Sequence, residues 1–164
     1  GYSYILDIEA RPKGHQHPIA IVDDRIPKQN SNTSQFSGPI YDYDYVDLTR
    51  FASQSVYAPE RLIKPLPGIR RVTVESEHLS LVKGADLITE PMAQWVVPTI
   101  PSLYVTAVRV TSNSLKTITL DPRLLRGDFL AASSQHSRVN AAGEEGDTTT
   151  WYLVSDQPFD EVSP

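Results

Sequence analysis

The sequence contains no cysteine, which excludes disulfides, thiolate metal sites and cysteine nucleophiles. It also lacks an apolar run of the roughly 20 residues that a membrane-spanning helix needs, so we expect no transmembrane span. Positive charge is in deficit, because 15 Lys and Arg residues stand against 20 Asp and Glu residues, which gives a net charge of −5. An acidic chain is a poor electrostatic partner for polyanions, and direct binding of nucleic acid is therefore not expected.

The remaining composition is that of a globular protein. The chain has 164 residues, of which 40% are hydrophobic and 21% charged. This length suits one domain with extensions or two small domains, and it can bury a core without metal or disulfide crosslinks.

The first 45 residues differ in character from the rest. Residues 2–9 alternate between apolar and polar, which indicates a half-buried strand. One strand cannot form a sheet, so we interpret residues 1–10 as the last strand of a truncated N-terminal β domain. Residues 11–45 contain four prolines and a polar run at 29–35, and they predict a linker, poorly ordered around 28–38.

A short helix is predicted next. Asp47 can serve as its N-cap, and Leu48, Phe51, Ala52 and Val56 follow at helical spacing. A proline at position 59 bars continuation, so the helix should end near residue 57 or 58.

The chain beyond this helix has the pattern of strands. Strands are predicted at residues 69–76, 92–97, 103–111, 116–120, 128–135 and 148–154, with turn-forming residues between them. One capped helical turn is predicted where Asp121 caps, Pro122 begins the turn and Gly127 stops it. The expected fold is mainly β: an immunoglobulin-like antiparallel β-sandwich over residues 46–160, preceded by the short helix. Residues 161–164 should form a frayed tail.

The histidines do not suggest an enzyme. His15 and His17 fall in the predicted linker, and His136 lies at a strand end after two serines. Catalysis by a hydroxyl nucleophile needs a general base held in a fixed geometry. Neither these three histidines nor His78 lies in a pattern that indicates such a geometry. We therefore expect no catalytic residues.

No cofactor or metal site is predicted either. Asp42, Asp44 and Asp47 are spaced like the start of a calcium loop. However, position 46, where such a loop would need a third acid, is Val46, and it follows Tyr45. The glycine that a calcium loop needs is also missing from the residues that follow. We instead interpret these aspartates as the solvent-exposed acidic end of the linker, with one of them capping the helix. The loop at 143–146 carries two glutamates, which disfavours phosphate binding.

The aromatic residues are the best candidates for binding. Tyr41, Tyr43 and Tyr45 alternate with acids, which would place all three rings on one face of an extended segment. They could form a first strand over the core, an intermolecular contact, or both. Trp95 and Trp151 lie within strand patterns, where core packing is the default and a ring interface the alternative.

Seven short motifs between residues 48 and 159 carry a resemblance to a known family. They are RFASQ at 50–54, YAPERL at 57–62, PGIRR at 67–71, YVTAV at 104–108, LDPRLLRGD at 120–128, QH at 135–136 and DTTTWYLVS at 147–155. In this order they closely resemble integrating conjugative element proteins, regarded as the TraK-like component of the element's type IV secretion system.

The resemblance implies a structural subunit of a conjugative envelope channel, located in the periplasm and associated with the outer-membrane complex. It implies as partners a small outer-membrane lipoprotein and a larger channel subunit, with a ring formed only in the full assembly. The alternative that the residues leave open is a carbohydrate- or ligand-binding β-sandwich module, which would need exposed aromatics around a polar groove.

Overall fold

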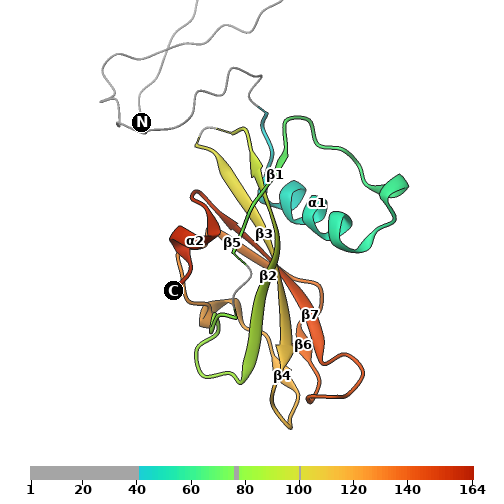
Figure 1. Ribbon diagram of the computed structural model, residues 1–164, viewed down its shortest axis with the longest axis vertical. Helices are drawn as coiled ribbons and strands as arrows, with labels where there is room; N and C mark the ends of the chain where they lie inside the picture. The colour runs from blue at the N-terminus through green and yellow to red at the C-terminus, as the bar shows by residue number, and fades with distance from the viewer. Residues whose placement is uncertain (1–40, 76–77, 100) are drawn as a thin grey trace, which may run out of the picture. The chain divides into compact units, whose positions relative to one another are not determined.

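Strands rich in β-branched residues form a twisted antiparallel sheet in the computed structural model (Figure 1). The structure describes residues 41–75, 78–99 and 101–164. The predictions for residues 1–40, including the first strand, most of the linker and both linker histidines, lie outside the described residues. Five strands make up the sheet in the order β1-β2-β3-β7-β5, and two short strands, β4 and β6, form a second sheet. The prediction of a mainly-β fold with a short helix before the strands is confirmed.

The elements follow one another as α1 (Tyr45–Tyr57), a 3-10 turn η1 (Glu60–Leu62), β1 (Arg70–Val72), β2 (Leu87–Val97), β3 (Leu103–Ser112), β4 (Ile118–Thr119), a 3-10 turn η2 (Pro122–Leu124), β5 (Ala131–Ser134), β6 (Arg138–Val139), β7 (Thr148–Ser155) and α2 (Phe159–Val162). None of the helices in the described parts of the chain is long and apolar enough to cross a membrane.

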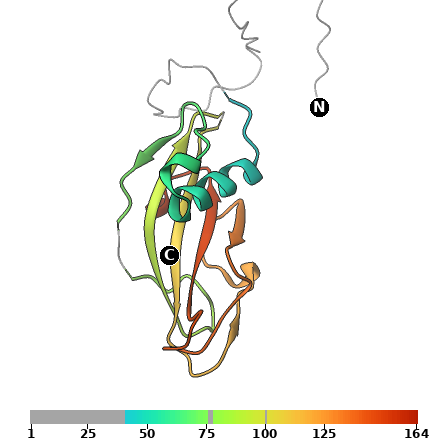
Figure 2. The same ribbon diagram turned by 90° about the vertical axis from the view of Figure 1, so that its right-hand side faces the viewer.

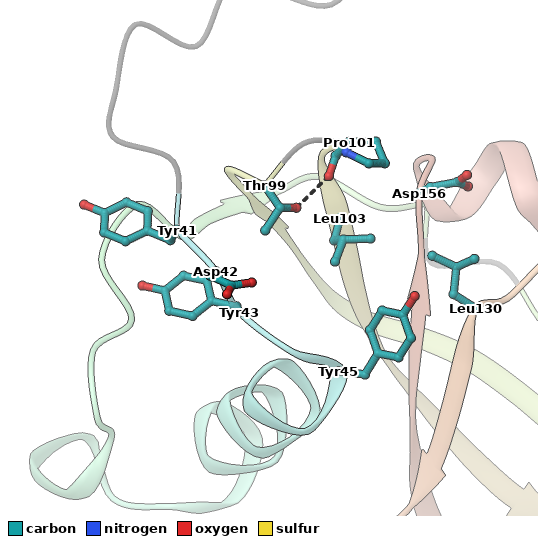
Figure 3. A pocket seen from close by; sticks show the side chains of 9 residues that line it. All are labelled: Tyr41, Asp42, Tyr43, Tyr45, Thr99, Pro101, Leu103, Leu130 and Asp156. Carbon is teal, nitrogen blue, oxygen red and sulfur yellow. Dashed lines mark hydrogen bonds between the residues drawn. The ribbon is translucent and has the colours of Figure 1, made fainter. Parts of the chain in front are cut away.

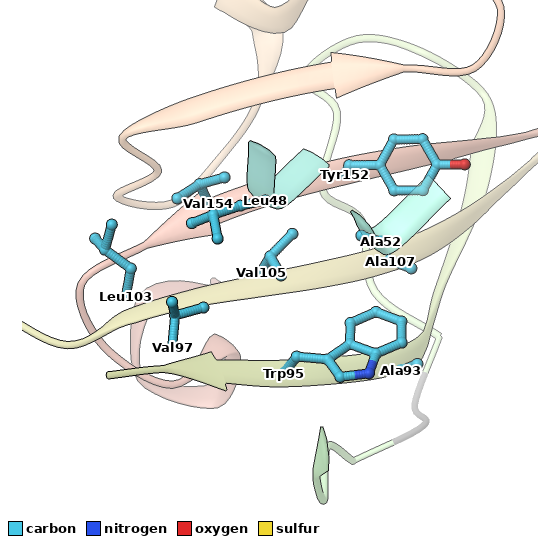
Figure 4. Close-up of a cluster of buried hydrophobic side chains, with 10 residues drawn as sticks. All are labelled: Leu48, Ala52, Ala93, Trp95, Val97, Leu103, Val105, Ala107, Tyr152 and Val154. Atoms are coloured by element: carbon cyan, nitrogen blue, oxygen red, sulfur yellow. The ribbon is translucent and has the colours of Figure 1, made fainter. Parts of the chain in front are cut away.

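Both faces of the large sheet bury apolar side chains. On one face α1 lies across the strands, as Figure 2 shows, and it contributes Leu48 and Ala52 to a core with side chains of β2, β3 and β7 (Figure 4). Neighbouring residues of a strand point to opposite faces, so Trp151 and Leu153 enter a second core. There they meet residues of the loops, the small sheet and α2. Both tryptophans are buried, at 7% exposed for Trp95 and 1% for Trp151, which confirms core packing.

A β-bulge lets β2 contribute to both cores. The pairing of β2 with β3 shifts between Pro91 and Ala93. Because side chains alternate with period two, the extra residue moves the odd-numbered side chains from one face to the other. Leu87 therefore lies in the core opposite α1, and Trp95 lies in the core beneath α1. Pro91 has no N–H to donate, and a bulge is a position where a strand tolerates that loss.

The start of α1 corrects one prediction. Asp44, not Asp47, is the N-cap, and its carboxylate accepts a hydrogen bond from the Asp47 N–H at 2.8 Å. The helix thus begins at Tyr45, before the predicted start, because Asp47 itself lies in the first turn, where its N–H needs an acceptor. Its end at Tyr57 agrees with the prediction.

The C-terminal segment is also better fixed than predicted. The turn capped by Asp121 forms as expected, with the carboxylate accepting from the Arg123 N–H at 3.0 Å. Phe159 is fully buried and Val162 is 7% exposed. The Val162 carbonyl accepts the Asp128 N–H at 3.1 Å. The tail expected to fray from residue 161 is therefore held to the domain through Val162.

Candidate binding groove

A groove of about 610 Å³ opens where four segments of the chain meet, and we call it the tyrosine groove (Figure 3). Its walls come from the segment leading into α1, the β2–β3 connection, the residue before β5 and the residue after β7. Its lining residues are Tyr41, Asp42, Tyr43, Tyr45, Thr99, Pro101, Leu103, Leu130 and Asp156. All three tyrosines predicted as an interface line this groove.

Backbone hydrogen bonds bring the walls together. The Tyr41 N–H donates to the Pro98 carbonyl at 3.4 Å, which ties the segment before α1 to the end of β2. The Leu130 N–H donates to the Val154 carbonyl at 2.8 Å, which places the start of β5 beside the end of β7. Within the β2–β3 connection, the Thr99 hydroxyl donates to the Pro101 carbonyl at 2.7 Å (Figure 3).

Two of the tyrosines form a stacked pair. The rings of Tyr41 and Tyr43 lie 5.5 Å apart, with 6° between their planes. The Tyr43 hydroxyl donates to the Pro67 carbonyl at 3.0 Å. Gly68, with φ of +80°, lies against the Tyr41 ring, and a Cβ at this position would come within 2.8 Å of that ring. Glycine at position 68 therefore makes room for the stack.

Tyr45 corrects the expectation that the three rings share one face. It is the first residue of α1, so the alternation of an extended chain ends before it. In Figure 3 its ring points toward Leu130, whereas the other two rings project away from that side. Residues 41–44 do not form a strand, although Tyr43 packs against the core beneath α1.

The chemistry of the groove is apolar with negative charge. Tyr45 is 42% exposed and Leu130 is 46% exposed, so both offer apolar surface. Of the lining residues that the structure describes, Asp42 and Asp156 are charged, and both are exposed. Burial, followed by the neighbouring Tyr41 and Asp47, raises the pKa of the Tyr43 hydroxyl above its usual value.

The comparison with protein families covers nearly the whole sequence. The family described as "Protein of unknown function (DUF3438)" matches residues 1–163. The chain belongs to this family. No curated protein and no solved structure gives a significant match to this chain.

The histidines of this DUF3438 member that the structure describes stay at the surface. His136 is exposed, and its Nδ1 lies 3.3 Å from the Thr149 hydroxyl oxygen. It borders a shallow polar hollow with residues such as Arg138 and Asn140. His78 is exposed as well.

The aspartates that resembled a calcium loop have separate roles in this DUF3438 member. Asp44 caps α1, while Asp42 lines the tyrosine groove. Across the described ranges, no three His, Asp or Glu side chains are grouped so that they could hold a metal ion.

Leu103, Leu130 and Asp156 also line the groove, but the sequence patterns did not predict this role. Leu103 and Leu130 fall within the strands predicted at 103–111 and 128–135, and Asp156 falls outside every predicted element. These residues are far from Tyr45 in sequence, and only the pairing of β3 with β7 and of β7 with β5 brings them together.

Proposed function

We propose that this chain is a structural subunit of a bacterial conjugative, type IV secretion envelope channel. It acts by protein–protein binding in DNA transfer by an integrating conjugative element. The tyrosine groove is the observation that carries the binding role, because it presents exposed apolar side chains in a concave surface. The assignment to a conjugative secretion channel rests only on the resemblance carried by the seven motifs.

The motif residues that carry the resemblance lie at positions that build the fold. YVTAV lies in β3, the central strand of the five-stranded sheet, and DTTTWYLVS spans β7 beside it. Pro67 of PGIRR accepts the Tyr43 hydroxyl hydrogen bond through its carbonyl, and Gly68 lies against the Tyr41 ring. Gly127 of LDPRLLRGD has φ of +114° and lies against the Val162 carbonyl. The motifs thus coincide with strands, turns and close backbone approaches that build the fold.

The alternative, a carbohydrate- or ligand-binding β-sandwich module, is less well supported. Such a site would use exposed aromatic rings around a polar groove. Trp95 and Trp151 are buried in the two cores and cannot contribute. Tyr41 and Tyr43 stack on each other, and Tyr43 also packs against the core.

A genetic test addresses the proposed function. Deleting the gene in frame should abolish transfer of the element without slowing growth, and the wild-type gene should restore transfer. Purification of the full-length protein from the envelope fraction should recover an outer-membrane lipoprotein and a channel subunit. Normal transfer after deletion, or recovery of cytoplasmic enzymes alone, would refute the proposal.

Surface variants connect the groove to that function. Replacing both Tyr45 and Leu130 by serine removes apolar surface from the groove, and we expect it to reduce transfer. Leu115→Ser is the matched control, because Leu115 is 91% exposed and follows β3 at the end opposite Leu103. The control should transfer normally. The isolated chain should remain a monomer or weak oligomer by light scattering, since the proposed ring needs the other subunits.

A further inference from the structure

We infer that the tyrosine groove binds an extended segment of a partner protein that carries arginine or lysine side chains. This inference rests on the proposed function, because it names the chemistry of the partner in the protein–protein contact. Three properties of the groove lead to it: its charge, its apolar surface and its size.

The described side chains that line the groove carry charge of one sign. Asp42 and Asp156 are the charged ones among them, and none of these described lining residues is a lysine, arginine or histidine. Neither carboxylate forms an ion pair or a side-chain hydrogen bond with another residue in the described ranges. Both are therefore available to a cationic group from outside, and an acidic partner would be repelled.

The apolar surface suits a long cationic side chain better than a compact cation. Tyr45 and Leu130 are 42% and 46% exposed and point toward each other across the groove (Figure 3). Arginine and lysine bury their methylene stems along apolar surface while the charged head stays near water or a carboxylate. A guanidinium can also stack on a tyrosine ring. Apolar side chains beside exposed carboxylates offer both contacts.

The size of the groove fits a peptide segment. Its volume of about 610 Å³ lies in the range of small-ligand sites, which take a few side chains and not a folded domain. An extended peptide directs alternate side chains to the same side, so two cationic side chains could enter while those between them stay outside. The occupant we propose is thus a short extended segment with alternating arginine or lysine.

The test uses three end-blocked octapeptides added to the full chain labelled with ¹⁵N. In the first, arginine alternates with serine; in the second, neutral citrulline replaces arginine; in the third, glutamate replaces it. We expect the arginine peptide alone to shift the backbone amide signals of Tyr45, Leu130 and Asp156, with an affinity that falls as salt is added. Absence of binding, equal binding of the citrulline peptide, or shifts confined to other regions would overturn the inference.

Charge variants locate the binding. Asp42→Asn with Asp156→Asn should weaken binding of the arginine peptide about three- to tenfold, because each exposed ion pair contributes little. The matched control is Glu144→Gln with Glu145→Gln, which removes two charges from an exposed loop outside the groove. Equal affinity in the groove variant and the wild type, or an equal loss in the control, would overturn the inference. If the double variant has a disturbed spectrum, Asp156→Asn alone supplies the comparison.

The two proposals can fail separately. If the arginine peptide does not bind but Tyr45→Ser with Leu130→Ser still reduces transfer, the partner chemistry is wrong and the proposed function stands. If the peptide binds as expected but deletion of the gene leaves transfer unchanged, the groove chemistry stands and the proposed function is wrong.

Discussion

Phe51 of α1 meets Trp95 of β2 edge to face, with ring centroids 5.8 Å apart and planes at 82°. Trp95 is a member of the core beneath α1, and Phe51 packs at the margin of that core. Aromatic pairs prefer this geometry because the positive edge of one ring faces the negative face of the other. The contact joins the helix to the sheet and thereby helps to place Tyr45, the first residue of α1, in the lining of the groove.

This aromatic contact should be measurable as a coupling energy. Phe51→Leu keeps most of the apolar area and removes the ring edge, so we expect the free energy of unfolding to fall by about 1 kcal/mol. Trp95→Leu should cost about 3 kcal/mol, because it also leaves a cavity. In a double-mutant cycle followed by urea unfolding, the coupling should be about 0.5–1.5 kcal/mol. Strictly additive losses would show that the ring geometry contributes nothing.

The N-cap of α1 offers a comparison of two nearby aspartates. Asp44→Ala removes the acceptor for the Asp47 N–H and should lower the free energy of unfolding by about 1 kcal/mol. Asp47→Ala leaves that hydrogen bond in place and removes only a first-turn charge, so its effect should be about 0.3–0.5 kcal/mol. Chemical denaturation of both variants tests this order, and a larger loss in Asp47→Ala would contradict the assigned cap.

Alkaline pH should destabilise the domain through Tyr152. Burial raises the pKa of this hydroxyl, hydrogen bonding to Ser53 partly opposes that rise, and Tyr57 adds a smaller rise. A folded-state pKa above the unfolded value favours the protonated form in the fold. The associated stability is complete below about pH 10, the usual tyrosine pKa, and is lost as the pH rises through the folded-state pKa.

Tyr152→Phe separates this effect from general alkaline unfolding. The Tyr152 hydroxyl donates to the Gln135 side-chain oxygen at 3.0 Å, so the variant should lose about 1 kcal/mol at neutral pH. Between pH 9 and 11 its stability should fall less steeply than that of the wild type. Urea unfolding at several pH values measures both slopes, and parallel slopes would rule out a contribution from Tyr152.

Local chemistry explains which parts of the fold could be predicted. β3 and β7 are rich in β-branched residues over their full length, and the observed bounds lie within one residue of the predicted ones. The turn after Asp121 was predictable because its cap and its first proline are adjacent in sequence. Each of these elements is specified by residues within itself.

Elements that depend on distant partners could not be predicted in this way. β6 has two residues and exists because Val139 pairs with Ile118. The first half of β2 was missed because Pro91 interrupts the strand pattern, and only the pairing with β3 shows that a bulge accommodates it. The tyrosines of the groove were found from their aromatic alternation, whereas Leu130 and Asp156 join them only through the order of the sheet.

Among the glycines in the described ranges, Gly127 should be the least tolerant of substitution. Its φ of +114° is strained for any L side chain, and a Cβ here would collide with the Val162 carbonyl and come within 2.8 Å of the Phe129 ring. Gly127→Ala should therefore lower the free energy of unfolding by about 2–4 kcal/mol, because α2 must shift to make room. Gly143→Ala is the control: φ there is +84° but a Cβ meets open space, so strain alone should cost about 1 kcal/mol. Urea unfolding of both variants isolates the contact with Val162, and equal losses would show that α2 yields without cost.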